Sequence, residues 1–203
     1  VFVAQLMTLP DMVELSDVGN FSHEHLEFYT LKSLGLLFAR HGLVIKDLER
    51  NTVNGRSTRL YVCHAGTRTS SPEVFRAFRS EQHLHNPAFY RQWQQEMDSN
   101  ARVLYWAVQN AVDRGKSVWV YGASTKGNAI LQHAGLSHDY IQGAAERSPE
   151  KWGLVTVGSG IPIYSERLAR EVNPDYFLVL PYAFIDEFVA REAKWLAKGG
   201  TFP

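Results

Sequence analysis

Cysteine is almost absent from this sequence, because Cys63 is the only one among 203 residues. A single cysteine cannot form an internal disulfide, which excludes the small secreted folds that depend on disulfides. We expect Cys63 to be a buried apolar residue. The low cysteine content is typical of a protein that works in the reducing cytoplasm.

The sequence also lacks an excess of charge and a long hydrophobic run. Its 21 Lys and Arg residues balance 21 Asp and Glu residues, whereas proteins that bind nucleic acid usually carry a strongly basic surface. No apolar run is long enough to span a bilayer, and no signal peptide is recognisable. With 45% hydrophobic residues, the chain should be globular. We expect no nucleic-acid or membrane partner, and the pattern does not indicate an oligomeric state.

The first 65 residues lack a glycine-rich turn after their first predicted strand. Their hydrophobic pattern predicts a strand, a helix and a hairpin. The predicted elements are a strand over 1–6, a short helix opening at Pro10, a helix over 26–40, and strands over 43–48 and 56–64 joined by an Asn54-Gly55 turn. In the last strand, Leu60 and Val62 should share one face. This order matches the closing third of a class I methyltransferase sheet. Such a fold normally opens with a glycine-rich turn that holds its cofactor, and no such turn occurs here.

The remainder of the chain alternates between strands and helices. A Thr/Ser-rich stretch from 66 to 72 is a candidate linker, and a long helix over 89–114 should bury its aromatic residues. Strands are then predicted over 117–121, 140–145 and 176–180, and helices over 126–134, 165–172 and 183–198; residues 201–203 could begin a further strand. Repeated β-then-α units predict a parallel, doubly wound α/β sheet.

The turn from Gly122 to Asn128 follows the first strand of this second region and precedes a helix. Open α/β sheets bind ligands at such turns, and the amides and dipole of a helix N-terminus attract anions. Ser124 and Lys126 add a donor and a positive charge. The spacing fits neither a Walker A loop nor a dinucleotide fingerprint. The turn is therefore either an anion site or an ordinary tight connection.

The segment His23-Glu24-His25 concentrates proton-transferring groups and allows three interpretations. On a strand, both imidazoles would lie on one face and could bind a metal ion, but no third ligand is evident nearby. One histidine could instead act as a general base that a carboxylate orients. Finally, the segment could be the polar first turn of a helix. The residues alone leave these alternatives open, with metal binding the least favoured.

Several motifs occur together in the order and spacing of one family. They are Asn20–Tyr29 (NFSHEHLEFY), Asn54–Arg59 (NGRSTR), Tyr121–Asn128 (YGASTKGN), Arg147–Gly153 (RSPEKWG), Ile161–Ile163 (IPI) and Pro174–Tyr176 (PDY). The chain resembles the C-terminal half of S-adenosylmethionine-dependent sugar C-methyltransferases, which act on nucleotide-linked 4-keto-deoxysugars. Three departures stand out: Ser22 replaces a common tyrosine, Ala123-Ser124-Thr125-Lys126 replaces Ala-Pro-Ala-Lys, and Glu146 replaces an aspartate.

The resemblance implies a division into three parts. Residues 1–65 would be the C-terminal part of a class I methyltransferase domain, 66–116 a linker and helical connection, and 117–203 a Rossmann-like domain that binds the nucleotide sugar. S-adenosylmethionine would be bound mainly by an N-terminal part that is missing here, so the isolated chain should be inactive. A non-catalytic module that binds a nucleotide or nucleotide sugar is the alternative.

The resemblance also implies roles for individual residues. His25 would be the base that removes a proton next to the ketone, and Glu24 would orient it. Substrate would be bound by the backbone and side chains of the turn, namely Tyr121, Gly122, Ala123, Ser124, Lys126 and Asn128. Lys126 and the Gly122–Ser124 amides would anchor the pyrophosphate. Asn54 and Arg59 are further candidates to line the cleft, and no metal is expected.

Overall fold

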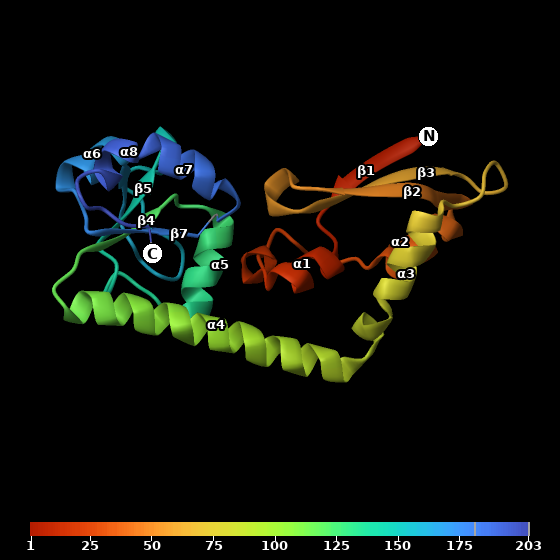
Figure 1. Ribbon diagram of the computed structural model, residues 1–203, viewed down its shortest axis with the longest axis horizontal. Coiled ribbons are helices and arrows are strands. Elements are labelled where there is room, and N and C mark those ends of the chain that lie inside the picture. Colours follow the sequence, from red (N-terminus) through yellow and green to blue (C-terminus); the bar gives the residue numbers. More distant parts are fainter. Residues whose placement is uncertain (181, 203) are drawn as a thin grey trace. The chain divides into compact units, whose positions relative to one another are not determined.

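The computed structural model describes residues 1–180 and 182–202, apart from the side chains of Asn54 and Ala183 (Figure 1). By its internal contacts the chain forms two compact units. The first unit comprises Val1–Asp17 and His23–Glu96, and the second comprises Val18–Ser22 and residues 97–202. Part of the predicted connecting segment, 66–96, therefore belongs to the first unit. The last boundary falls inside helix α4 (Pro87–Asp113).

The first unit is built on an antiparallel sheet of three strands. Their order is β1 (Phe2–Leu6), β3 (Ser57–His64) and β2 (Leu43–Asn51). The turn η2 (Val53–Gly55) joins β2 to β3, as the Asn-Gly signal predicts. Leu60 and Val62 are fully buried against helices α2 (Leu31–Arg40) and α3 (Pro72–Ser80), which pack on this face. Helix α1 (Leu9–Leu15) and the turn η3 (Gln82–His85) complete the elements of this unit.

Helix α2 begins at Leu31, five residues after the predicted start. The Thr30 side chain accepts the Ser33 amide hydrogen, and the Ser33 hydroxyl lies 3.0 Å from the Thr30 amide. This reciprocal cap stops the helix from extending backward. Residues 25–30 consequently have no regular structure, and His23 and Glu24 lie in a turn. The interpretation of His-Glu-His as a first helical turn is therefore wrong, and so is its placement on a strand.

The second unit contains a parallel sheet whose strands run β6 (Ile163–Ser165), β5 (Gly143–Glu146), β4 (Val118–Tyr121) and β7 (Tyr176–Val179). In chain order these are the third, second, first and fourth strands, which is the order of a doubly wound Rossmann-like sheet. This confirms the predicted α/β fold class. Strands and helices alternate along this unit, which places helices on both faces of the sheet. Strand β4 is therefore apolar at all four positions.

Two hydrophobic cores cover the two faces of the parallel sheet. Helices α4 and α5 (Thr125–Ala134) pack on one face through residues that include Val108 and Leu131. Helices α6 (Glu166–Val172), α7 (Ile185–Arg191) and α8 (Ala193–Leu196) pack on the other. The turn η1 (Val18–Asn20), from the N-terminal part of the chain, lies against α5. None of the helices in the described ranges is long and apolar enough to cross a membrane.

Four details of the second unit differ from the sequence prediction. The helix expected over 183–198 is interrupted: a turn, η5 (Tyr182–Phe184), precedes α7, and Glu192 separates α7 from α8. Strand β5 begins three residues late, at Gly143. Thr201 forms a single bridge to Tyr176, and Pro203 lies outside the described residues. Trp106 is 62% exposed although we expected it in the core.

Candidate functional site

The turn between β4 and α5 lies where the strand order of the parallel sheet reverses. Gly122 has a φ of 90°, a conformation that side chains other than glycine rarely adopt. Ser124 then caps α5, because its Oγ accepts the Gly127 amide hydrogen at 3.0 Å. A Cβ on Gly127 would lie 3.2 Å from Leu180 Cδ1, so glycine lets the helix approach the end of β7. This edge of the sheet is where doubly wound folds bind ligands.

The amides of this turn are partly occupied within the protein. The Ala123 amide donates to Glu146 Oε2 at 2.9 Å, and the Gly122 amide donates to the Ala145 carbonyl at 2.8 Å. Two of the three amides in the predicted Gly122–Ser124 anchor therefore already have partners. The start of α5 offers further amides for an anion, since the first amides of a helix have no intrahelical acceptors, although Ser124 already accepts from the Gly127 amide. Lys126 belongs to the same first turn of the helix.

Glu146 and Lys151 clamp the turn from the end of β5. Lys151 Nζ donates to the Ala123 carbonyl at 3.0 Å and lies 3.5 Å from Glu146 Oε2. Glu146 Oε1 accepts the amide hydrogens of Arg147 and Ser148. Burial acts to raise the pKa of Glu146, but the amides of Ser148 and Ala123 and the Lys151 charge outweigh it and hold the pKa below its usual value. Glu146 is thus an ionised carboxylate beside the turn.

The side chains of the other predicted residues of the turn differ in their burial and in their hydrogen-bond partners. The Tyr121 side chain is buried on the opposite side from α5, and its hydroxyl donates to Glu192 Oε1 at 2.5 Å while accepting from Arg191 Nε at 3.0 Å. Burial raises its pKa, so the hydroxyl keeps its proton. Lys126 is half-buried. The Asn128 Oδ1 atom is buried and has no hydrogen-bond partner among the described residues.

The remaining four predicted residues belong to the first unit. Glu24 and His25 are exposed and lie outside helices and strands. Arg59, on the sheet face away from α2 and α3, donates to Gln5 at 3.0 Å and to Glu49 at 2.6 Å. Asn54 lies in the η2 turn, and its side chain is outside the described residues. The structure therefore gathers six predicted residues at one turn, and the four others lie in a separate unit.

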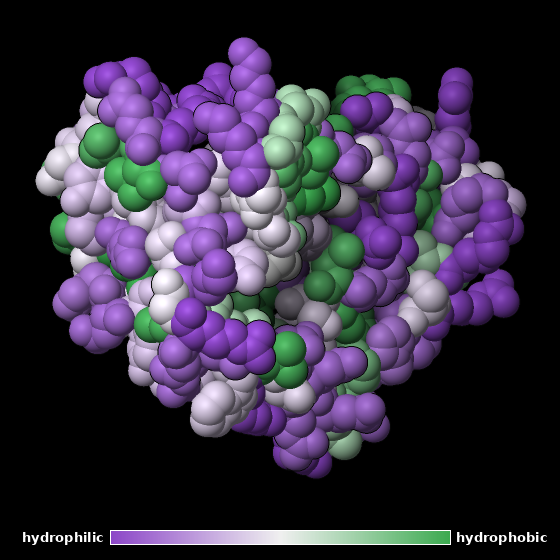
Figure 2. Space-filling view, turned by 60° about the vertical axis from the view of Figure 1, so that its left-hand side comes forward, coloured by the Kyte–Doolittle hydropathy of each residue, from purple (hydrophilic) through white to green (hydrophobic). Residues whose placement is uncertain are grey.

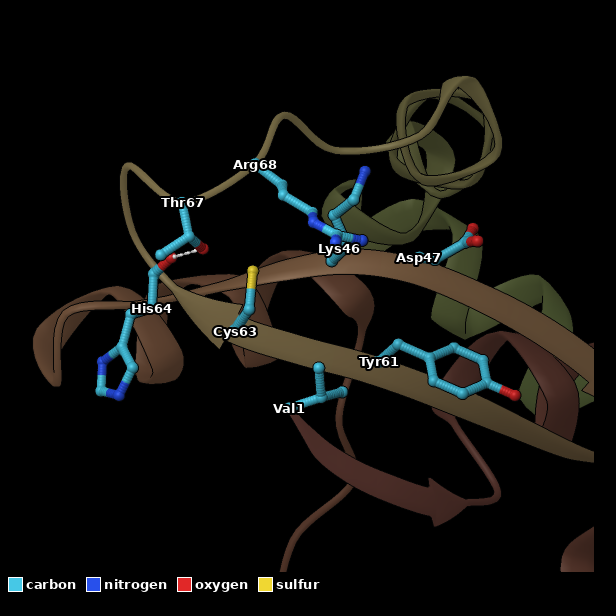
Figure 3. Close-up of a pocket in the computed structure, with 8 residues that line it drawn as sticks. All are labelled: Val1, Lys46, Asp47, Tyr61, Cys63, His64, Thr67 and Arg68. Carbon is cyan, nitrogen blue, oxygen red and sulfur yellow. Dashed lines mark hydrogen bonds between the residues drawn. The ribbon is translucent and has the colours of Figure 1, made fainter.

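The first unit also contains a pocket of about 540 Å³ that the sequence did not suggest (Figure 3). It is lined by Val1, Lys46, Asp47, Tyr61, Cys63, His64, Thr67 and Arg68. The Cys63 sulfur points to the side of the strands where Lys46 and Arg68 lie, and the His64 ring points away (Figure 3). Cys63 is partly exposed, contrary to our expectation of a buried residue. None of the ten predicted site residues lines this pocket.

A groove of about 500 Å³ in the second unit runs between α4 and the sheet. Its lining includes Leu104 and Val108 from the helix, and Val118 and Tyr176 from the sheet. Val118 and Tyr176 are the first residues of β4 and β7. The groove therefore opens at the amino ends of the strands, which is the edge opposite the β4–α5 turn.

One feature of the candidate site was not predicted from the sequence, namely the clamp of Glu146 and Lys151 on the turn. Lys151 lies in the Arg147–Gly153 motif, but nothing in that motif indicates a contact with Ala123. Conversely, the Pro174–Tyr176 motif has a structural explanation: Asp175 accepts the Ser117 amide and hydroxyl hydrogens and joins β4 to β7. In the described part of the chain, no three His, Cys, Asp or Glu side chains gather as a metal site requires.

Comparisons with known proteins agree with the fold of the second unit. Residues 52–203 match the family model of the C-methyltransferase C-terminal domain. Over 201 residues the chain is 32% identical to C-methyltransferase NovU of Streptomyces niveus, an alignment that covers 96% of this chain and 48% of that protein. The chain thus spans about half the length of this relative. By the family match and this identity, the chain belongs to the C-methyltransferase family, and it corresponds to the C-terminal half of such a protein.

Proposed function

We propose that the protein methylates a carbon next to the ketone of a nucleotide-linked keto-deoxysugar, and that this chain supplies its substrate-binding half. The second unit would bind the diphosphate at the β4–α5 turn. The observation that carries this assignment is the position of the turn, which joins a helix N-terminus and Lys126 at the reversal of strand order. We also propose that the protein works in the cytoplasm, which fits its single cysteine.

The proposed chemistry begins with removal of a proton. A hydrogen on the carbon next to a ketone is acidic because the resulting negative charge spreads to the oxygen. A neutral imidazole titrates near neutral pH and can accept this proton. His25 is exposed, so its ring is accessible to a substrate. We assign the base to His25 and the orientation of its ring to Glu24, with Asn54 and Arg59 as weaker substrate contacts.

S-adenosylmethionine would supply the methyl group. The described residues of the first unit do not provide a glycine-rich turn to hold it: β1 is followed by Met7-Thr8-Leu9-Pro10. Of the buried Asp11 carboxylate, Oδ2 accepts hydrogen bonds from Thr8 and from Thr58, whose hydroxyl lies 2.9 Å away. Its Oδ1 lies 3.9 Å from Arg50 Nε and has no hydrogen-bond partner among the described residues. We therefore assign no residue of this chain to the cofactor and propose that it binds elsewhere in the protein.

Proton removal can be tested separately from methyl transfer. The full-length protein, incubated in D₂O with a nucleotide-linked 4-keto-deoxysugar, should exchange the hydrogen next to the ketone, as followed by mass spectrometry. His25→Asn should slow this exchange by about 100-fold or more, the usual share of a general base. His23→Asn, a change in a histidine that is also exposed, should leave it unchanged. Exchange at the wild-type rate in a folded His25→Asn protein would rule out His25 as the base.

Diphosphate binding can be tested on the 203-residue chain itself. Calorimetry with a nucleoside-diphosphate sugar should show binding to the wild type and about tenfold weaker binding to Lys126→Ala, since one charge-assisted contact is lost. No binding to either protein would disprove the anion site.

A second candidate is a non-catalytic nucleotide-sugar-binding module. The absence of a glycine-rich turn after β1 favours it for this chain. Binding of the nucleotide sugar by the full-length protein without exchange of the hydrogen next to the ketone would support this alternative over the enzyme.

A further inference from the structure

Trp152 stands at the carboxyl edge of the parallel sheet with 44% of its surface exposed. It follows the turn η4 (Pro149–Lys151), just after β5. Trp93, Trp119 and Trp195 are buried, as is usual for so large an apolar side chain. Trp152 Nε1 donates to the Glu146 carbonyl at 2.9 Å. This bond engages the edge of the indole rather than an aromatic face, and it restrains the orientation of a ring that belongs to a partly exposed residue.

The indole is attached to the same residues that clamp the β4–α5 turn. Glu146, whose carbonyl holds Trp152, also accepts the Ala123 amide hydrogen through its carboxylate. Lys151, the preceding residue, donates to the Ala123 carbonyl at 3.0 Å. Trp152 is therefore joined to the turn through the side chains of two residues, Glu146 and Lys151. A partly exposed aromatic ring is thus held at the end of β5, the strand that pairs with β4.

We propose that Trp152 stacks on the nucleobase of the ligand whose diphosphate binds at the start of α5. The inference rests on the proposed function, because it takes the diphosphate as the neighbouring group. In a nucleoside diphosphate, one ribose separates the base from the first phosphate, so an aromatic ring at the end of the neighbouring strand is suitably placed for the base. Stacking on an aromatic side chain tolerates any base because every base has an aromatic face.

Hydrophobic neighbours offer a competing explanation. Hydrophobic side chains reach the surface in several places (Figure 2), and Leu154, Val155 and Val157, in the same loop as Trp152, are each more than half exposed. Together with Trp152 they could contact another protein chain. Geometry favours the nucleobase, because the Trp152 side chain itself is held by a hydrogen bond to Glu146 of the clamp. Leu154 meets the clamp only through its backbone amide, which donates to the Lys151 carbonyl. Contact between chains is therefore an outcome that the experiment must separate.

The test uses the 203-residue chain, with uridine 5′-diphosphate and inorganic pyrophosphate as calorimetric probes. Trp152→Ala should weaken binding of uridine diphosphate by about tenfold, which is the range of one base stack. It should leave pyrophosphate binding unchanged. Trp152→Phe, which keeps an aromatic face, should recover most of the affinity. Trp106→Ala removes the other exposed tryptophan of the second unit and should affect neither probe.

Fluorescence provides a readout that a purely structural role would not change. Uridine diphosphate should quench part of the tryptophan emission of the wild type, and pyrophosphate should not. Trp152→Phe should bind uridine diphosphate but lose this quenching, whereas Trp106→Phe should keep it. Quenching that persists in Trp152→Phe would overturn the inference.

The outcomes separate the inference from the function on which it rests. If Lys126→Ala weakens both probes but Trp152→Ala binds uridine diphosphate like the wild type, the stacking inference is overturned and the anion site stands. If neither probe binds the wild type, the stacking inference and the anion site are both overturned. If Trp152→Ala changes only the sedimentation coefficient, and nucleotide affinity is unchanged, the residue serves contact between chains and the inference is overturned.

Discussion

The Glu146 carboxylate accepts the Ala123 amide hydrogen at 2.9 Å, so a negative charge stands beside the turn at which we place a diphosphate. A carboxylate and a phosphate repel each other, and both use amide donors. Lys151, 3.5 Å from Glu146 Oε2, offsets part of this charge. The clamp therefore gives the turn its shape and at the same time opposes anion binding. These two effects can be separated by experiment.

Replacing Glu146 with glutamine keeps the side-chain shape but removes the charge. We expect pyrophosphate to bind severalfold more tightly to Glu146→Gln, because repulsion across a few ångströms near a protein surface amounts to about 1 kcal/mol or more. The free energy of unfolding should fall by about 1–2 kcal/mol, since amides that donated to a carboxylate lose a charged acceptor. Calorimetry and urea denaturation measure the two effects.

Glu150→Gln is the matched control, because Glu150 is an exposed residue of the same loop. It should change neither quantity appreciably. Weaker pyrophosphate binding by a folded Glu146→Gln protein would contradict the expected repulsion.

Two serine caps allow a comparison between helices. Ser124 Oγ accepts from the Gly127 amide at the start of α5, and Ser165 Oγ accepts from the Leu168 amide at the start of α6. Ser124→Ala and Ser165→Ala should each destabilise the protein by about 1 kcal/mol in urea denaturation. Only Ser124→Ala should also weaken pyrophosphate binding in calorimetry. Equal effects of both variants on binding would place the anion elsewhere.

Tyr121 is a predicted substrate residue whose hydroxyl is buried between Glu192 and Arg191. Tyr121→Phe should lower the free energy of unfolding by about 1–3 kcal/mol, because Glu192, which accepts the hydroxyl hydrogen, stays buried. Nucleoside-diphosphate affinity should be unchanged, since only the backbone of Tyr121 adjoins the turn. Tyr164→Phe serves as the control, because the described residues offer its hydroxyl no hydrogen bond. A loss of affinity in Tyr121→Phe would indicate that the hydroxyl contacts the ligand.

Glu81 should make the stability of the first unit depend on pH. Burial raises its pKa from 4.5 to about 7, even though the Leu31 amide donates to Oε2 at 2.8 Å and Arg50 lies near; the Asp11 charge also raises it. The folded state therefore binds this proton more tightly than the unfolded state. Its contribution to stability is complete below about pH 4.5 and is lost as the pH rises through 7.

Glu81→Gln tests this dependence, because the amide oxygen can still accept the Leu31 hydrogen. At pH 8 the variant should be more stable than the wild type by about 1–3 kcal/mol. The difference should shrink as the pH falls toward 4.5. Denaturation by urea at several pH values measures it, with the exposed Glu73→Gln as control. A difference that does not vary with pH would show that Glu81 does not titrate in this range.

The sequence predicted most elements because their signals are local. The Asn54-Gly55 turn, the end of α4 before Gly115 and the cap at Ser165 all depend on neighbouring residues. The break at Glu192 depends instead on a distant partner. Arg170, 22 residues earlier, donates to both Glu192 oxygens, and the backbone of Glu192 is non-helical at this point. The spacing of hydrophobic residues along the sequence carries no information about such a contact.

The predictions for the candidate site divide in the same way, between local signals and contacts of residues distant in the sequence. The β4–α5 turn was predicted because a strand, glycines, a capping serine and a lysine are contiguous. The clamp was missed because Glu146 is 23 residues from Ala123 and becomes its neighbour only when β5 pairs with β4. The start of α2 was misplaced because Thr30 and Ser33 cap the helix where the apolar spacing already looked helical.

The chain crosses between its two units three times, after Asp17, after Ser22 and within α4. A single cut therefore cannot release the second unit whole, because the η1 segment that lies against α5 comes from the N-terminal side. An exchange of this unit between homologous C-methyltransferases should therefore transplant residues 18–22 together with 97–202. A chimera joined only inside α4 would pair α5 with a foreign η1 and lose stability for reasons unrelated to ligand binding.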